Sequence, residues 1–166
     1  DLSEVLSSNS TAHDTSNFTH SILKSSLRLP KTNNLETEIG IDINVETAQG
    51  KRIEFQKQSV SDYAIYSNLE WAASSKLIFR PGLRYSYNTN YNSPIIPSVN
   101  IKYDFHNIFL RSSFAKGFRS PSLKEQFFNF VDINHNITGN KNLLAETSNN
   151  FQFSISHTLR LYNNSI

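Results

Sequence analysis

The sequence contains no cysteine and no methionine, and only five glycines and five prolines among its 166 residues. Without cysteine, the chain can form neither a disulfide framework nor a thiolate zinc site. The glycines are isolated from one another, which excludes a glycine-rich loop of the kind that cradles phosphate groups. Because a complete translation product starts with methionine, we expect the chain to be a processed or excised piece.

Long apolar runs are also missing, which restricts how the chain could cross a membrane. No run approaches the roughly 18 apolar residues that a membrane-spanning helix needs. The first residues are too polar for the apolar core of a secretory signal. The formal net charge is only +2, with Lys and Arg scattered among Asp and Glu, so we expect no nucleic-acid partner. If the chain crosses a membrane, it must do so with strands.

About seven segments of the sequence alternate between apolar and polar residues. In the clearest one, the largely apolar odd positions from Leu35 to Val45 alternate with polar residues that include Glu36, Glu38 and Asp42. A helix would scatter these acids around its circumference, whereas a strand places them on one face. We therefore predict an all-β antiparallel fold, with Glu46 and the other acids on a solvated strand face rather than in a catalytic pair. The other alternating segments are 22–29, 63–71, 77–87, 97–105, 108–115 and 151–161.

The alternation places each residue on one of two faces, and a register shift of one residue would exchange the faces. The predicted apolar face, which meets lipid if the sheet belongs to a membrane barrel, contains Leu77, Phe79, Leu83, Tyr85, Val99, Ile101, Tyr103, Ile108, Leu110, Phe114, Phe151, Phe153 and Ile155. The predicted polar face, which lines the lumen of such a barrel, contains Arg80, Arg84, Asn100, Lys102, Arg111, Gln152 and Arg160.

The connections between the segments alternate between short and long. Short ones lie near Pro30, Ala73 and His106, and long ones are predicted at 49–61, 88–92 and 118–147, with residues 1–17 as a further loop. This asymmetry, the length of the strands and the aromatic residues near strand ends are typical of up-and-down transmembrane β-barrels with short periplasmic turns and long extracellular loops. A soluble antiparallel β-sandwich or barrel that acts as a binding module shows the same one-sided pattern, so periodicity leaves both architectures open.

The long connection at 118–147 has internal signals of its own. Ser120 followed by Pro121 is typical of a helix cap with proline at the first helical position. The sequence from Ser122 to Glu125 matches a capping box. We therefore predict a short helix near 121–128 within an otherwise all-β chain.

Two motifs in this connection carry a family resemblance. The segment Ala115-Lys-Gly-Phe-Arg-Ser-Pro-Ser-Leu-Lys-Glu125, and Gly139-Asn-Lys-Asn-Leu143 with Glu146 behind it, resemble the paired FRAP and NPNL motifs of TonB-dependent outer-membrane receptors. Ser120 stands where that family usually has alanine, and Lys141 where it usually has proline. The resemblance extends more loosely from about Leu35 to Leu161. The residues that match the motifs are Phe118, Arg119, Pro121, Gly139, Asn140, Asn142 and Leu143.

The resemblance implies that residues 1–166 are a partial barrel domain, because about seven strands cannot make the plugged 22-stranded barrel of this family. It implies a receptor in the bacterial outer membrane that is surrounded by lipid and imports an iron chelate, either haem or a ferric siderophore. Energy would come from the TonB complex, which acts through a plug domain that is not recognisable in this chain. Such a role requires no enzymatic chemistry and no tightly bound cofactor.

The resemblance also directs attention to His135, between the two motifs. In the haem-uptake branch of this family a histidine in an outer loop is functional, so His135 is a candidate axial ligand of haem iron, with Phe127, Phe128 and Phe130 against the porphyrin. Asn134 and Arg119 complete the predicted ligand-binding set. The alternative is a loop histidine that makes a hydrogen bond or no contact. The polar-face cations could line a path for an anionic ligand, or pair with carboxylates of the lumen or the plug.

Overall fold

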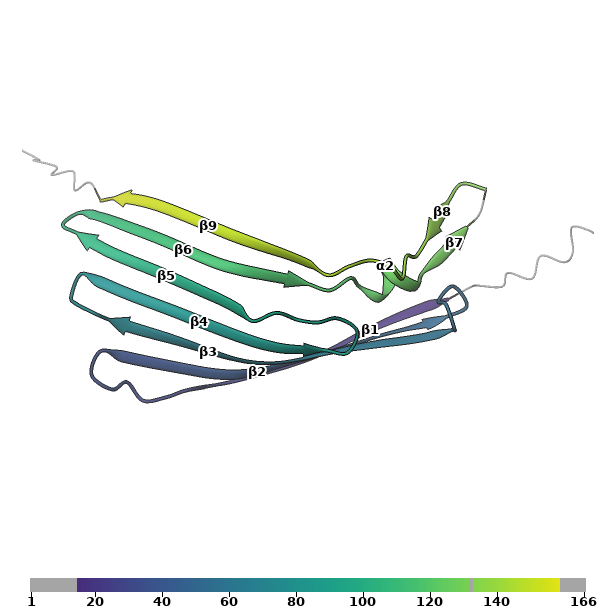
Figure 1. Cartoon of the computed structure of the whole chain (residues 1–166), viewed down its shortest axis with the longest axis horizontal. Coiled ribbons are helices and arrows are strands. Elements are labelled where there is room, and N and C mark those ends of the chain that lie inside the picture. The colour runs from purple at the N-terminus through teal and green to yellow at the C-terminus, as the bar shows by residue number, and fades with distance from the viewer. Residues whose placement is uncertain (1–14, 132, 159–166) are drawn as a thin grey trace, which may run out of the picture. The chain divides into compact units, whose positions relative to one another are not determined.

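The computed structural model describes residues 15–131 and 133–158, and its main feature is one antiparallel sheet of seven strands (Figure 1). The strands follow one another in the sheet in the order β1-β2-β3-β4-β5-β6-β9. Their bounds are β1 Ser16–Arg28, β2 Leu35–Gly50, β3 Lys57–Ala72, β4 Leu77–Asn88, β5 Ile96–Phe105, β6 Ile108–Arg119 and β9 Glu146–His157. The predicted all-β antiparallel architecture is confirmed.

The strand register brings the predicted apolar residues together on one face. Leu77 lies opposite Tyr103, which lies opposite Leu110, which in turn lies opposite Ile155. Two residues along each strand, the next row of the same face carries Phe79, Ile101, Ser112 and Phe153, so Ser112 is the one polar residue of this row. The intervening positions carry the predicted polar residues, since Arg80 pairs with Asn100 and Lys102 pairs with Arg111. Of the predicted polar face, Arg160 lies outside the described residues.

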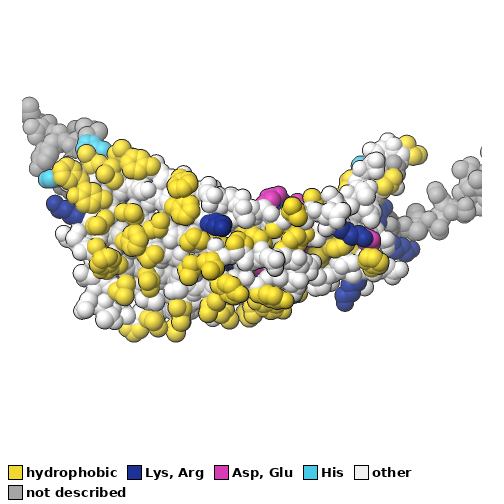
Figure 2. Space-filling model, viewed as in Figure 1, with side chains coloured by type: hydrophobic (Ala, Val, Ile, Leu, Met, Phe, Trp, Pro, Cys, Tyr) yellow, Lys and Arg dark blue, Asp and Glu magenta, His cyan; other side chains and the backbone are white. Residues whose placement is uncertain are grey.

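The apolar face is exposed rather than packed into a core. Figure 2 shows hydrophobic side chains spread over the strands of the sheet, and Phe151, Phe153 and Ile155 are 81%, 66% and 64% exposed. Leu123 is the one large side chain in the described residues that is fully buried. Soluble monomers rarely expose apolar patches of more than a few hundred Å², so this face needs an apolar environment.

The predicted long loop at 49–61 is wrong, because most of it is strand. β2 continues to Gly50 and β3 starts at Lys57, which leaves a turn at 51–56 closed by a hydrogen bond from the Gly50 N–H to the Gln56 carbonyl. In this part of the hairpin Thr47 and Ser59 share a hydrogen bond between their hydroxyls, so a face that is apolar elsewhere is polar here. The alternation that identifies strands therefore disappears from the sequence although the backbone pairing continues.

The start of β1 also differs from the prediction. The strand begins at Ser16, not near Ile22, so the predicted loop at 1–17 is wrong for its last two residues, and residues 1–14 lie outside the described part of the chain. The short connections at 29–34, 73–76 and 106–107 agree with the prediction. His106 adopts a positive φ of 55° in the two-residue turn between β5 and β6.

The connection between β6 and β9 is shorter than the predicted 118–147 and contains three short elements. β6 continues to Arg119 and β9 starts at Glu146, and these two residues pair with each other, so the connection covers 120–145. It contains the helix α2 at Leu123–Phe127 and the hairpin of β7 (Asn129–Val131) and β8 (Asn136–Thr138). We call residues 120–145 the motif loop.

The helix α2 confirms the capping box but not the predicted cap. Ser122, not Ser120, is the N-cap residue: its hydroxyl accepts the Glu125 N–H, and its own N–H donates to the Glu125 carboxylate at 2.8 Å. Pro121 is buried and precedes the cap residue, so it is not the first helical residue.

No helix within 15–131 and 133–158 combines the length and the apolar character that a membrane span needs.

The chain separates into two compact units. The first contains Glu46–Ser59 and Ser122–Leu143 together with residues up to His20, and it holds the turn at 51–56 and most of the motif loop. The second contains Ser21–Val45, Val60–Pro121 and the chain from Leu144, and it holds most of the sheet.

Candidate functional site

In the first unit, the second motif packs directly against the helix that follows the first motif. The Asn140 N–H donates to the Glu125 carbonyl at 3.0 Å, and the Gly139 N–H donates to the Asn129 side-chain carbonyl at 3.1 Å. A Cβ atom at Gly139 would lie 2.5 Å from the carbonyl oxygen of Gln126, closer than real Cβ contacts come. Glycine is therefore required here for close approach of two backbones.

The turn at 51–56 binds the motif loop through backbone hydrogen bonds. The Glu54 N–H donates to the Phe127 carbonyl at 3.0 Å, and the Asn129 N–H donates to the Arg52 carbonyl at 2.8 Å. The Lys141 ammonium pairs with the Glu54 carboxylate. Lys141 thus has a structural contact at the position where the family motif usually has proline.

Aromatic rings form a row through the first unit that ends at His135. Phe18 contacts Phe128 edge-on with 6.1 Å between ring centroids, and Phe128 lies 6.5 Å from Phe130. The His135 imidazole stacks on Phe130 at 5.1 Å, and the Arg52 guanidinium lies 3.8 Å from the centroid of the Phe130 ring. We call these five residues the aromatic row.

The aromatic row contains part of the predicted ligand-binding set. Phe128 and His135 belong to it, Phe127 is half-buried at the end of α2, and Asn134 is exposed beside His135. Arg119 belongs instead to the second unit, where it makes two hydrogen bonds to Glu146, at 3.0 and 3.1 Å. No group of three or more His, Asp or Glu side chains that could hold a metal ion occurs within 15–131 and 133–158.

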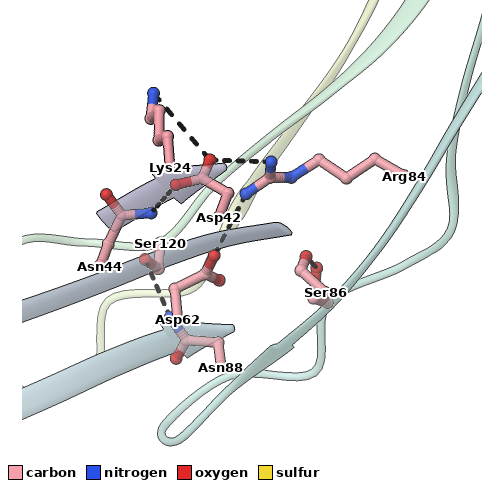
Figure 3. Close-up of polar contacts among 9 residues, drawn as sticks. Lys24, Asp42, Asn44, Asp62, Arg84, Ser86, Asn88 and Ser120 are labelled. Carbon is pink, nitrogen blue, oxygen red and sulfur yellow. Dashed lines mark hydrogen bonds and ion pairs between the residues drawn. The ribbon is translucent and has the colours of Figure 1, made fainter. Parts of the chain in front are cut away.

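In the second unit, the polar face of the sheet carries a network centred on Arg84 (Figure 3). Its guanidinium donates to Asp42 at 2.9 Å and to Asp62 at 3.4 Å. Asp42 also accepts from the Asn44 amide at 3.0 Å and lies 4.0 Å from the Lys24 ammonium. One arginine thus neutralises two acids from neighbouring strands in a partly buried environment.

Other polar-face ions pair in the same way. Arg80 donates to Glu70 at 2.6 Å, and Lys102 donates to Asp104 at 3.0 Å. Pairing with carboxylates of the same face therefore accounts for three of the predicted cations, and it leaves Arg111 without an ion pair among the described residues.

Asn88, the last residue of β4, and Tyr91, in the connection at 89–95, were not singled out from the sequence. The Asn88 side-chain carbonyl accepts the N–H groups of Asn90 and Tyr91 at 2.9 and 3.1 Å, and its amide donates to the Ser120 hydroxyl at 3.5 Å. Burial raises the pKa of the Tyr91 phenol above its ordinary value. The Asn-rich composition of 88–92 indicated a loop, but an asparagine that caps its own turn cannot be told from an exposed one by sequence.

The chain thus combines an antiparallel sheet that has one exposed apolar face and one ion-paired polar face with a long structured loop between two of its strands. The family model for the TonB dependent receptor-like, beta-barrel domain matches residues 6–166. The chain therefore belongs to the TonB-dependent receptor β-barrel family, as the two motifs indicated.

Several solved structures of similar fold are receptors for siderophores. The siderophore receptor PirA from Pseudomonas aeruginosa has a TM-score of 0.76 and 24% identity over 87% of this chain. The ferric enterobactin receptor PfeA of the same organism, in complex with enterobactin, has a TM-score of 0.72 and 14% identity over 87% of this chain. PirA from Acinetobacter baumannii has a TM-score of 0.67 and 16% identity over 87% of this chain. The chain spans 29%, 25% and 25% of these three proteins respectively. No curated protein matches the chain.

Proposed function

We propose that the chain is part of an outer-membrane receptor that binds an iron chelate and imports it with energy from the TonB complex. The observation that carries this proposal is the two-faced sheet within a family of TonB-dependent receptor barrels. Its apolar face suits lipid, and its ion-paired polar face suits a wide water-filled lumen. The rest of the receptor, including any plug that TonB would contact, lies outside this chain.

A ferric siderophore is the ligand class that the first unit supports best. Three cations there lie close to phenylalanine rings: Arg52 near Phe130 at 3.8 Å, Lys124 near Phe128 at 5.7 Å and Lys141 near Phe55 at 5.3 Å. Aromatic faces together with cations suit an anionic chelate that carries aromatic groups. The solved structures of similar fold, named as siderophore receptors, point the same way.

Haem is the second candidate, and one observation favours it. The His135 imidazole is exposed and stacks on Phe130, so a flat porphyrin could bind beside ring surfaces that are already in place. In a haem receptor His135 supplies the axial nitrogen. In a siderophore receptor it only extends the aromatic row.

Binding spectra of the full-length receptor separate the two ligands. For a siderophore receptor, tryptophan quenching by ferric enterobactin saturates, and the Soret band of added haem is the same for the wild-type protein and for His135→Ala. A matched control is His157→Ala, an exposed histidine at the end of β9. A Soret shift that His135→Ala abolishes and His157→Ala keeps would replace siderophore by haem. Binding of neither ligand, or uptake that persists in cells lacking TonB, would contradict the proposed function.

A further inference from the structure

The polar face of the sheet opens into a groove over β4, β5, β6 and β9 whose charged lining is entirely positive. The groove has a volume of about 380 Å³. Its charged residues are Arg80, Lys102 and Arg111, and no Asp or Glu of the described residues lines it. Amide and hydroxyl groups of Asn100, Ser113, Gln152 and Ser154 supply further hydrogen-bonding atoms.

The arrangement of two of these cations is costly without an anion. Lys102 and Arg111 are direct partners in the register of β5 and β6. Like charges at directly opposed positions destabilise a strand pair, because their side chains leave the sheet about 5 Å apart. On the other side of Arg111 the partner is Ser154, which is neutral.

Neighbouring carboxylates pair with two of the three cations. Asp104 pairs with Lys102, and Glu70 pairs with Arg80, but both acids lie outside the groove lining. Arg111 has no ion pair within 15–131 and 133–158, so its guanidinium offers its donors to the groove. A planar guanidinium beside an ammonium suits a carboxylate or another oxyanion.

We propose that this groove is an anion-binding site on the polar face, with Arg111 as its principal donor and Lys102, Gln152 and Ser154 as additional donors. The occupant is an oxyanion, most simply a carboxylate. It arrives either on a dissolved ligand or on a side chain of the protein beyond this chain. This proposal depends on the proposed function only in that the polar face lines the lumen, and it does not depend on which chelate the receptor carries.

Charge-selective modification of an introduced cysteine in the full-length receptor tests the site. Gln152→Cys is placed in the groove, in a background with no other reactive cysteine, and is treated with methanethiosulfonate reagents of similar size that carry a sulfonate or a trimethylammonium. We expect the sulfonate reagent to react about tenfold faster, because the potential of clustered charges concentrates counter-ions by that order. Adding Arg111→Gln should reduce this preference several-fold.

The matched control is Ser98→Cys, on the same face of β5, where Glu36, Glu38 and Glu70 outnumber the cations Arg28 and Arg80, so no preference for the anionic reagent is expected. Equal rates for the two reagents in the Gln152→Cys variant, or a preference that Arg111→Gln leaves unchanged, would overturn the proposal. If the cysteine at position 152 is protected from both reagents while the cysteine at position 98 reacts, the groove is filled by the protein itself. A crystal structure of the full receptor must then show a carboxylate on Arg111, and a neutral side chain there would equally overturn the proposal.

Discussion

Arg84 holds two carboxylates of the polar face at once, so both of them depend on its guanidinium. Its guanidinium separates Asp42 from Asp62, whose side chains are 10% and 23% exposed. Without it, two carboxylates from neighbouring strands would face each other in a region of limited solvent access. Repulsion between the two carboxylates and the loss of charged hydrogen bonds would both destabilise the sheet.

We therefore predict that Arg84→Gln destabilises the sheet by about 1–3 kcal/mol, the cost of leaving charged partners unsatisfied. The measurement is the temperature at which the detergent-solubilised receptor unfolds. Arg80→Gln is the control, because its pair with Glu70 is more exposed, and exposed pairs contribute little. Equal effects of the two substitutions would show that Arg84 contributes no more than an ordinary surface pair.

His135 illustrates what the sequence could and could not predict at this scale. Its place between two motifs drew attention to it, but nothing in the sequence indicated that it would stack on Phe130 or that Arg52 would lie against that ring. Both contacts depend on how the turn at 51–56 meets the motif loop. The role of His135 as a haem ligand remains a prediction.

At the scale of elements, the predictable strands were those with an apolar face. In the strands between Leu77 and Ile155 the alternation determined which residues share a face, because a one-residue shift in register would move every apolar side chain of a strand to the polar face. The ends of β2 and β3 near Gly50 and Lys57 could not be found in this way, since the face that is apolar elsewhere carries Thr47 and Ser59 here, and the buried apolar residues Ala48 and Val60 lie on the other face. The strands continue there although the alternation that identified them is lost.

The contact between α2 and the second motif gives a prediction about the motif loop. Gly139→Ala forces a methyl group against the backbone at Gln126 and Phe127, atoms that cannot rotate away. We expect a loop that proteases cleave faster and a weaker affinity for ligand, while the barrel still forms. Limited proteolysis and ligand titration of the full receptor measure these effects.

Gly117→Ala is the matched control for that experiment. A methyl group at Gly117 would meet the hydroxyl of Ser148, which can change rotamer, so the loop should be unaffected. Wild-type protease resistance and affinity in Gly139→Ala would mean that the close backbone approach does not hold the loop in place.

At the scale of the whole molecule, the chain accounts for one part of a barrel wall. β1 and β9 are the two ends of the strand order, and the chain spans 29% of the PirA receptor from Pseudomonas aeruginosa. The alternation of apolar and polar residues predicted the wall, and two short motifs predicted the family.

If the sheet is part of a membrane barrel, one of its faces meets lipid and the other meets water, and labelling of single cysteines in the intact receptor distinguishes the two faces. Leu83→Cys and Ile101→Cys lie on the apolar face of β4 and β5, while Ser98→Cys and Asn100→Cys lie on the polar face of β5. We predict that a lipid-phase probe labels positions 83 and 101 and that a water-soluble maleimide labels positions 98 and 100. Labelling of positions 83 and 101 by the aqueous reagent alone would contradict the membrane-barrel account.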